Sequence, residues 1–341
     1  MAKPEDKSGN GNTQLHWRTE LHRFADDVLR SFAERDDVHG VALGGSLARG
    51  LEWKHSDVEL AIVVDQRLDE FGHFAVREGR GFEIFQFIEA ELREQIDRAQ
   101  TDPTAVLDWP IQIYQCRVVA DLSGLLERFK EAFDRQLFSA EVVSAKVARS
   151  LEGFDREFAT AQADLAAGKP LTALAQLRAA FNHLILAFYW RHQILPRSQN
   201  RTATLLRMHC RRLGAPDFYG LYCDVYGFDL TSAQARRLLA GCQSEVDDIV
   251  SGFGPAAADF FYHAVDGEFR WGQTKGILAV YRLYVPLCLR RFQKQEGVFD
   301  NPTWREAHGE LCRFVGLERP DAAATAQLLA CTQVYRARLA A

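Results

Sequence analysis

The fold of this chain is decided by two neighbouring stretches, Gly44-Gly45-Ser46-Leu47-Ala48-Arg49-Gly50 and Ser56-Asp57-Val58-Glu59-Leu60-Ala61-Ile62-Val63-Val64. Apolar residues dominate positions 38–43 and 57–64, which predicts a strand on each side of a glycine-rich turn. Residues two apart on a strand face the same side, so Asp57 and Glu59 are expected to point together above the turn. Two carboxylates beside a phosphate-sized turn suit a divalent cation and a nucleotide.

The sequence changes character near residue 135. Before that point we expect two further strands, at 82–88 and 111–119, and a charged loop or hairpin at 69–81. We also expect helices at 15–34, 90–100 and 122–135. After Ser139 strand signals almost vanish, and helices are predicted at 138–167, 171–192, 203–213, 232–250, 275–291 and 322–339. The prediction is an α+β protein with a disordered tail at 1–13, a small mixed-sheet α/β domain at 14–135 and an all-helical domain at 136–341.

Composition narrows the class of protein. The 341 residues are 47% hydrophobic and 26% charged, as in ordinary globular proteins, and the net charge of −5 argues against a protein that grips nucleic acid nonspecifically. Seven scattered cysteines without a Cys-x-x-Cys pair argue against a zinc site or a disulfide framework. The start of the chain is polar, and the apolar run 184–190 is too short to span a bilayer. We therefore expect a cytoplasmic protein with no membrane association.

A third carboxylate, Glu83, is expected to join Asp57 and Glu59, because an unpaired charge among the large apolar residues of a predicted strand would be costly. Three carboxylates can hold two cations about 3.5–4 Å apart, the arrangement that neutralises charge in nucleotidyl transfer. Ser46, the glycine N–H groups and Arg49 are expected to contact the phosphates. The predicted cofactors are therefore Mg²⁺, as two ions, with an NTP as co-substrate.

The combination of Gly45-Ser46, Asp57-x-Glu59 and Glu83 resembles the polymerase-β-type nucleotidyltransferase superfamily. Within it, Gly45-Ser46-Leu47-x-Arg49 and Ser56-Asp57-x-Glu59 are similar to the kanamycin (aminoglycoside 4′-O) nucleotidyltransferase group, over about residues 40 to 160. The resemblance implies that the α/β domain is a nucleotidyltransferase domain. It assigns the metal to Asp57, Glu59 and Glu83, and nucleotide contacts to Gly45, Ser46, Arg49 and Ser56.

The resemblance also implies a general base at Glu152, on the long predicted helix that opens the helical domain, and a phosphate-contacting cation at Arg156. Residues four apart share one face of a helix, so the two side chains can act together. The alternative is an ordinary solvated Glu–Arg pair on a helix surface. Because enzymes of the family complete the active site across a dimer interface, the resemblance further implies a homodimer, although the additional C-terminal helices could close the pocket within one chain.

The acceptor is expected to differ from that of the kanamycin enzymes. Phe74 and Ala148 stand where acidic residues facing a cationic aminoglycoside are expected. The sequence therefore predicts Mg-dependent transfer of an NMP from an NTP to a hydroxyl of a less cationic small molecule, an antibiotic or natural product, with release of pyrophosphate. Two alternatives remain: a protein or RNA acceptor, which the acidic net charge disfavours, and a non-catalytic nucleotide-binding protein, which the presence of all three carboxylates disfavours.

Overall fold

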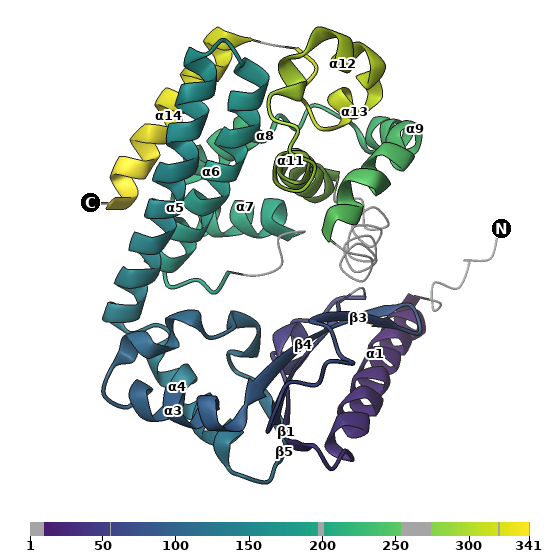
Figure 1. Cartoon of the computed structure of the whole chain (residues 1–341), viewed down its shortest axis with the longest axis vertical. Helices are drawn as coiled ribbons and strands as arrows, with labels where there is room; N and C mark the ends of the chain where they lie inside the picture. The colour runs from purple at the N-terminus through teal and green to yellow at the C-terminus, as the bar shows by residue number, and fades with distance from the viewer. Residues whose placement is uncertain (1–9, 55, 197–200, 254–273, 320, 341) are drawn as a thin grey trace, which may run out of the picture. The chain divides into compact units, whose positions relative to one another are not determined.

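The chain forms two compact units, Met1–Val142 and Val143–Ala341. The structure, a computed structural model, describes residues 10–54, 56–196, 201–253, 274–319 and 321–340 (Figure 1). A sheet lies in the first unit and helices make up the second, which confirms the α+β class. Residues 1–9 of the predicted disordered tail lie outside the described residues, and helix α1 (Asn10–Ala33) begins earlier than expected.

The first unit contains a mixed five-stranded sheet with the strand order β3-β4-β2-β1-β5. Its strands are β1 (Val38–Leu43), β2 (Val58–Val64), β3 (Phe74–Arg77), β4 (Arg80–Ile88) and β5 (Arg117–Asp121). Strands β2 and β4 run parallel, whereas the other neighbours are antiparallel. The parallel pair places the starts of β2 and β4, where the sequence has its carboxylates, at the same end of the sheet.

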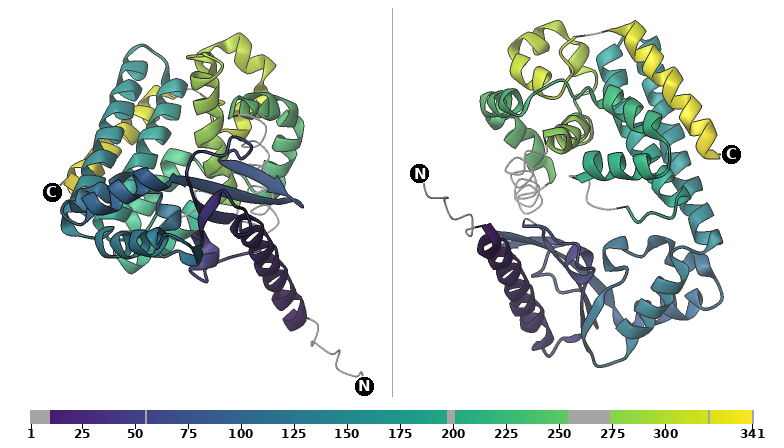
Figure 2. Two further views of the ribbon diagram at one scale, coloured as in Figure 1. Left: turned by 60° about the horizontal axis from the view of Figure 1, so that its bottom comes forward. Right: turned by 180° about the vertical axis from the view of Figure 1, so that it is seen from behind.

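The two faces of the sheet are covered by different helices, as the views in Figure 2 show. Alternate residues of β2 and β4, among them Leu60, Ile62 and Ile84, pack with the apolar side of α1. The opposite face packs against α4 (Leu125–Gln136), through contacts such as Phe87 with Phe129. Helix α3 (Glu89–Ala99) lies beside α4. Because strand residues alternate, Glu59 and Glu83 belong to the face opposite α1.

The predicted strand at 111–119 is wrong in its first half. Residues Ile111–Ile113 form a 3₁₀ turn, and β5 begins only at Arg117. The carbonyl oxygen of Tyr114 accepts a hydrogen bond from Arg49 (3.0 Å) rather than from a strand, and Gln115 has a φ of 57°, which no extended strand contains. A second 3₁₀ segment, Pro103–Asp108, precedes this turn. By contrast, the predicted hairpin at 69–81 is present as β3 and the start of β4.

Helices build the second unit, which the chain enters through the long α5 (Ala140–Ala166). The described helices that follow are α6 (Pro170–Arg191), α7 (Thr202–Arg212), α8 (Pro216–Tyr226), α9 (Ser232–Val250), α11 (Thr274–Arg291), α12 (Pro302–Ala307), α13 (Gly309–Phe314) and α14 (Ala322–Ala340), with 3₁₀ turns at Ser251–Phe253 and Val298–Asp300. Together with α5, five of them match predicted helices. The sequence did not predict α8, α12 and α13, which are short and in part aromatic.

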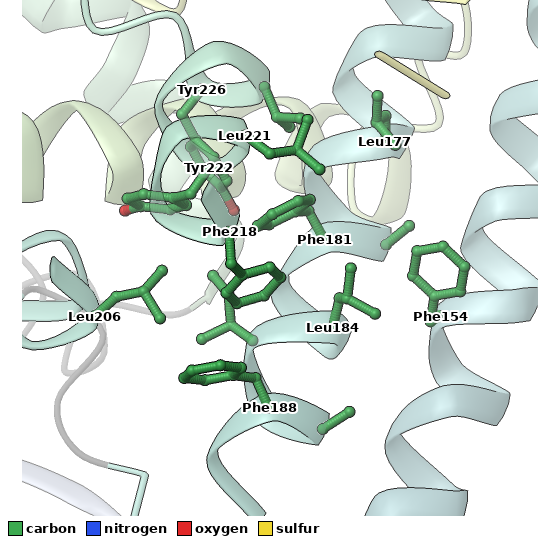
Figure 3. Packing of buried hydrophobic residues seen from close by; sticks show 14 of the residues in the cluster. Phe154, Leu177, Phe181, Leu184, Phe188, Leu206, Phe218, Leu221, Tyr222 and Tyr226 are labelled. Carbon is green, nitrogen blue, oxygen red and sulfur yellow. The ribbon is translucent and has the colours of Figure 1, made fainter. Parts of the chain in front are cut away.

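Helix α6 is the central helix of the second unit. Its Phe181 and Phe188 stack on Phe218 of α8, with ring centroids 5.4 and 4.7 Å apart (Figure 3). The helix is long and apolar enough to cross a membrane by length and composition, although the apolar run at 184–190 within it is too short to do so. However, 61% of its most apolar window is buried inside the fold, as is typical of a core helix.

Two fully buried arginines, Arg178 of α6 and Arg282 of α11, join the helices of this unit. Both guanidinium groups donate hydrogen bonds to backbone carbonyls near the C-terminal ends of α8 and α13. These carbonyls are those of Val225, Val315 and Gly316 for Arg178, and of Tyr226, Gly227 and Phe314 for Arg282. Helix C-termini carry unsatisfied carbonyls and a partial negative charge, which the two cations complement. Arg282 in addition forms an ion pair with the exposed Asp229, at 3.0 Å.

Candidate active site

The turn after β1 holds the Glu59 carboxylate in place. Gly45 opens the short helix α2 (Gly45–Ala48) with a φ of +65°, and a Cβ at this position would overlap the Glu59 carboxylate. The Ser46 N–H donates a hydrogen bond to Glu59 Oε2 (3.2 Å), and the Gly44 N–H donates to the Glu59 carbonyl (2.7 Å). Only glycine at position 45 combines this backbone conformation with the close approach of a side chain.

Two hydroxyl groups and one guanidinium organise the rest of the turn. The Ser46 hydroxyl lies 3.0 Å from the Ser56 hydroxyl, which is buried and also accepts a hydrogen bond from the Trp53 N–H (3.0 Å). Arg49 donates to the carbonyls of Gln112 (3.4 Å) and Tyr114 (3.0 Å). These contacts fix the segments on either side of the turn, whereas contacts of Ser46, Ser56 and Arg49 with phosphates stay a prediction.

The three carboxylates lie close together at the start of the parallel strand pair. Glu59 of β2 is directly opposite Glu83 of β4 in the register, and Asp57 precedes Glu59 by two residues on the same face. Glu83 is buried and the other two are half-buried. Burial and the charge of Glu83 raise the pKa of Asp57 to about 7. Burial, followed by the charges of Asp57 and Glu83, raises the pKa of Glu59 well above its usual range.

A histidine that the sequence pattern does not predict, His73, also contacts this cluster. His73 Nε2 lies 2.7 Å from Glu83 Oε1, and its Nδ1 lies 3.2 Å from the carbonyl oxygen of Ile84. The Glu83 carboxylate raises the pKa of His73. His73 reaches Glu83 because the next residue, Phe74, begins β3 directly opposite Glu83. No local motif marks this histidine, so its place becomes visible only once β3 is paired with β4.

The predicted site residues fall into two groups. The first group lies close together in the first unit and consists of Gly45, Ser46, Arg49, Ser56, Asp57, Glu59 and Glu83. Glu152 and Arg156 belong to the second unit, where they lie one helical turn apart on α5, and both are exposed. Arg156 has the carboxylate of Glu157 3.5 Å away. The roles of Glu152 as base and Arg156 as phosphate contact stay predictions.

The donor atoms of the carboxylate cluster fit a hard divalent cation such as Mg²⁺, because all of them are oxygens. The charge of Glu83 raises the pKa of Asp57, and the charges of Asp57 and Glu83 raise the pKa of Glu59, so a bound cation would relieve this repulsion. These three residues would hold the metal.

A second set of possible ligands, His39, Asp65 and Glu89, lies at the other ends of the strands, with its ligand atoms within 4.8 Å of one another. Basic side chains already pair with the Glu89 carboxylate of this set. His39 lies 2.8 Å from Glu89, and Arg93 lies 2.8 Å from the same carboxylate. We interpret it as an ion-pair cluster.

Comparisons with known proteins give little beyond this geometry. No protein-family model matches the chain, and no curated protein matches its sequence. Among solved structures, the chain is similar to a nucleotidyltransferase-like protein from Exiguobacterium sibiricum. The sequence identity is 14%, the TM-score is 0.34, and the match covers 87% of this chain and 90% of the other. A similarity of this size leaves the assignment of function to the residues themselves.

Proposed function

We propose that the protein is a nucleotidyltransferase that moves an NMP from an NTP to a hydroxyl group of a small molecule and releases pyrophosphate. One observation carries the proposal: Glu59, directly opposite Glu83 and held by the Ser46 N–H, forms with Asp57 a cluster of carboxylates that stay close despite mutual repulsion. A fold retains such a cluster at a cost in stability, which is typical of functional sites.

The nucleotide is expected to bind above the turn. Mg²⁺ held by Asp57, Glu59 and Glu83 would supply positive charge to the phosphates of the NTP. The N–H groups of Gly44 and Ser46 already donate to Glu59, so the Gly45 N–H at the start of α2 and the adjacent Ser46 hydroxyl are the donors proposed for a phosphate. Backbone N–H groups at such a turn can donate to phosphate oxygens. The chain's part is then to position the triphosphate and the three carboxylates, and a bound cation would favour the ionised form of these carboxylates.

The acceptor is proposed to be less cationic than an aminoglycoside. Phe74, directly opposite Glu83 in the β3–β4 ladder, presents an apolar ring where a cationic acceptor would need a carboxylate. The His73 ring stacks edge-on against both Phe74 and Phe85, with centroids 4.4 and 5.1 Å away, so the surface beside Glu83 is aromatic. This surface supports an acceptor with an apolar face beside its reactive hydroxyl. Glu152 is the proposed general base for that hydroxyl, with Arg156 offsetting charge on the phosphates.

Pyrophosphate release tests the proposal. The purified chain is incubated with Mg²⁺ and each NTP in turn, against aminoglycosides, lincosamides, nucleosides and sugars. We expect release that depends on one class of acceptor and disappears in the Asp57→Asn variant. The matched control is Asp69→Asn, which removes an exposed carboxylate from the loop after β2. Release that persists in Asp57→Asn, or that Asp69→Asn abolishes equally, would overturn the assignment of the site.

A further inference from the structure

The second unit contains a cavity of about 80 Å³ between α5, α6 and α11 and the segment that leads to the 3₁₀ turn at Val298–Asp300. Figure 1 shows α5 and α6 side by side. One part of the wall is apolar and includes Leu283, Pro286 and Phe299. The remainder carries Gln176 and charged side chains of both signs. The cavity is separate from the carboxylate cluster, which belongs to the first unit.

Gln176 is the observation that points to a ligand in this cavity. It lies on α6 with only 7% of its surface exposed, and its side chain forms no hydrogen bond with another residue in the part of the chain that the structure describes. The amide oxygen and nitrogen of Gln176 remain accessible rather than enclosed by apolar atoms, so water in the cavity can hydrogen-bond to them and a polar ligand atom can take the place of that water. The amide of Gln176 offers both a donor and an acceptor to whatever fills the cavity.

The charged residues of the wall complement a molecule that carries both charges. Asp164 of α5 is half-buried, and burial raises its pKa, although the charges of Lys169 and Arg290 oppose the rise. Asp164 and Lys169 form no side-chain hydrogen bond or ion pair within 4 Å with any other described residue. Arg290 lies 3.7 Å from the carboxylate of Glu157. The lining therefore offers two carboxylates, those of Asp164 and Glu296, for an ammonium group and two cations for a carboxylate.

The volume limits the size of the ligand. A cavity needs roughly 10–15 Å³ for each water molecule it holds, so this one has room for about five to eight waters or for a ligand with about as many non-hydrogen atoms. Small α-amino acids such as serine and alanine have this size. They also carry an ammonium and a carboxylate group a short distance apart.

We propose that this cavity binds a small zwitterion of α-amino acid size, with its carboxylate at Lys169 and Arg290, its ammonium group at Asp164 and a polar atom at Gln176. The apolar wall formed by Leu283 and Phe299 covers the carbon atoms of the ligand. This binding site is independent of nucleotidyl transfer. It would remain if the carboxylate cluster of the first unit had another role.

Isothermal titration calorimetry of the full chain tests the site with defined probes. L-serine and L-alanine carry both charges, acetate carries only the carboxylate, and ethylamine carries only the ammonium group. We expect at least one of the two amino acids to bind more tightly than either half-probe by about tenfold or more, because each charge-assisted hydrogen bond adds to the affinity. Half-probes that bind as tightly as the amino acids, or no binding of either amino acid, would overturn the proposal.

Two variants locate the site. Lys169→Met removes an exposed cation, and Gln176→Leu replaces the amide by an apolar group of similar size. Both are expected to weaken amino acid binding by about tenfold. The control, Lys294→Met, changes an exposed lysine that does not line the cavity and should leave binding unchanged. Circular dichroism confirms that each variant is folded. Equal affinity in the wild type, Lys169→Met and Gln176→Leu would show that the amino acid binds elsewhere and would refute the site.

Discussion

Replacing Asp57 with Asn should stabilise the protein while it abolishes activity. In the native state Asp57 is pushed toward its neutral form, mainly by burial and then by Glu83, so that its pKa rises from an ordinary value of 3.8 to about 7. The neutral amide of Asn avoids both the loss of hydration and the repulsion. A carboxylate that lowers the stability of the fold is expected at a site where function requires its charge.

The stability gained by Asp57→Asn follows from the raised pKa of Asp57 and depends on pH. Well below pH 3.8 the Asp57 carboxyl is protonated in both the folded and the unfolded chain, so its ionisation does not affect stability. As the pH rises toward 7, the unfolded chain releases the proton and the folded chain retains it, which lowers the free energy of unfolding. At about 1.4 kcal/mol per pKa unit, and because neighbouring carboxylates share the effect, the loss should reach about 2–4 kcal/mol above pH 7.

Urea denaturation of the wild type and Asp57→Asn, followed by circular dichroism from pH 4 to pH 8, measures this difference. The stability gained by the variant should be smallest at pH 4 and should grow as the pH rises. Added Mg²⁺ should stabilise the wild type more than the variant, because it binds the native carboxylates. The control Asp69→Asn should follow the wild-type curve. A gain in stability that is the same at pH 4 and pH 8, or a variant less stable than the wild type at pH 8, would refute the reasoning.

Three further predictions concern single residues. Gly45→Ala should lower the free energy of unfolding by about 1–2 kcal/mol because of its left-handed backbone alone, and by more because the new Cβ overlaps Glu59. Urea denaturation measures this loss, and an unchanged midpoint would contradict the close packing of Gly45 against Glu59. Glu152→Gln should slow turnover by about 10²–10⁴-fold without changing acceptor affinity, and the control Glu141→Gln on the same helix should not; a change in affinity alone would make Glu152 a binding residue. Arg178→Met should destabilise the protein by about 2–5 kcal/mol, because three buried carbonyls lose their donor; a loss below about 1 kcal/mol would show that water replaces the guanidinium.

The elements with strong periodic patterns could be predicted from the sequence. The strands at 38–43 and 57–64 and the helix at 232–250 agree with β1, β2 and α9 to within a residue. These segments are buried along a whole face or a regular stripe, so their hydrophobic pattern repeats with the period of the structure. The proximity of Asp57 and Glu59 followed from the alternation of strand residues.

Other features depend on contacts between distant segments. The last residues of the predicted strand at 111–119 do form β5. In its first half, however, the carbonyls of Gln112 and Tyr114 accept hydrogen bonds from Arg49, an interaction that no local sequence pattern indicates. His73 reaches Glu83 only through the β3–β4 pairing. Arg178 is a charged residue that the sequence would place at the surface, yet carbonyls of two helix ends surround it.

Binding of Mn²⁺ as a paramagnetic substitute for Mg²⁺, followed by electron paramagnetic resonance, tests the central claim most directly, because it does not depend on knowing the acceptor. The wild type, Asp57→Asn and Asp69→Asn are each titrated in the presence of non-hydrolysable analogues of the four NTPs. We predict that at least one analogue promotes tight Mn²⁺ binding in the wild type and in Asp69→Asn, and that Asp57→Asn loses it. Equal Mn²⁺ affinity in all three proteins with every analogue would contradict a metal–nucleotide site at Asp57, Glu59 and Glu83.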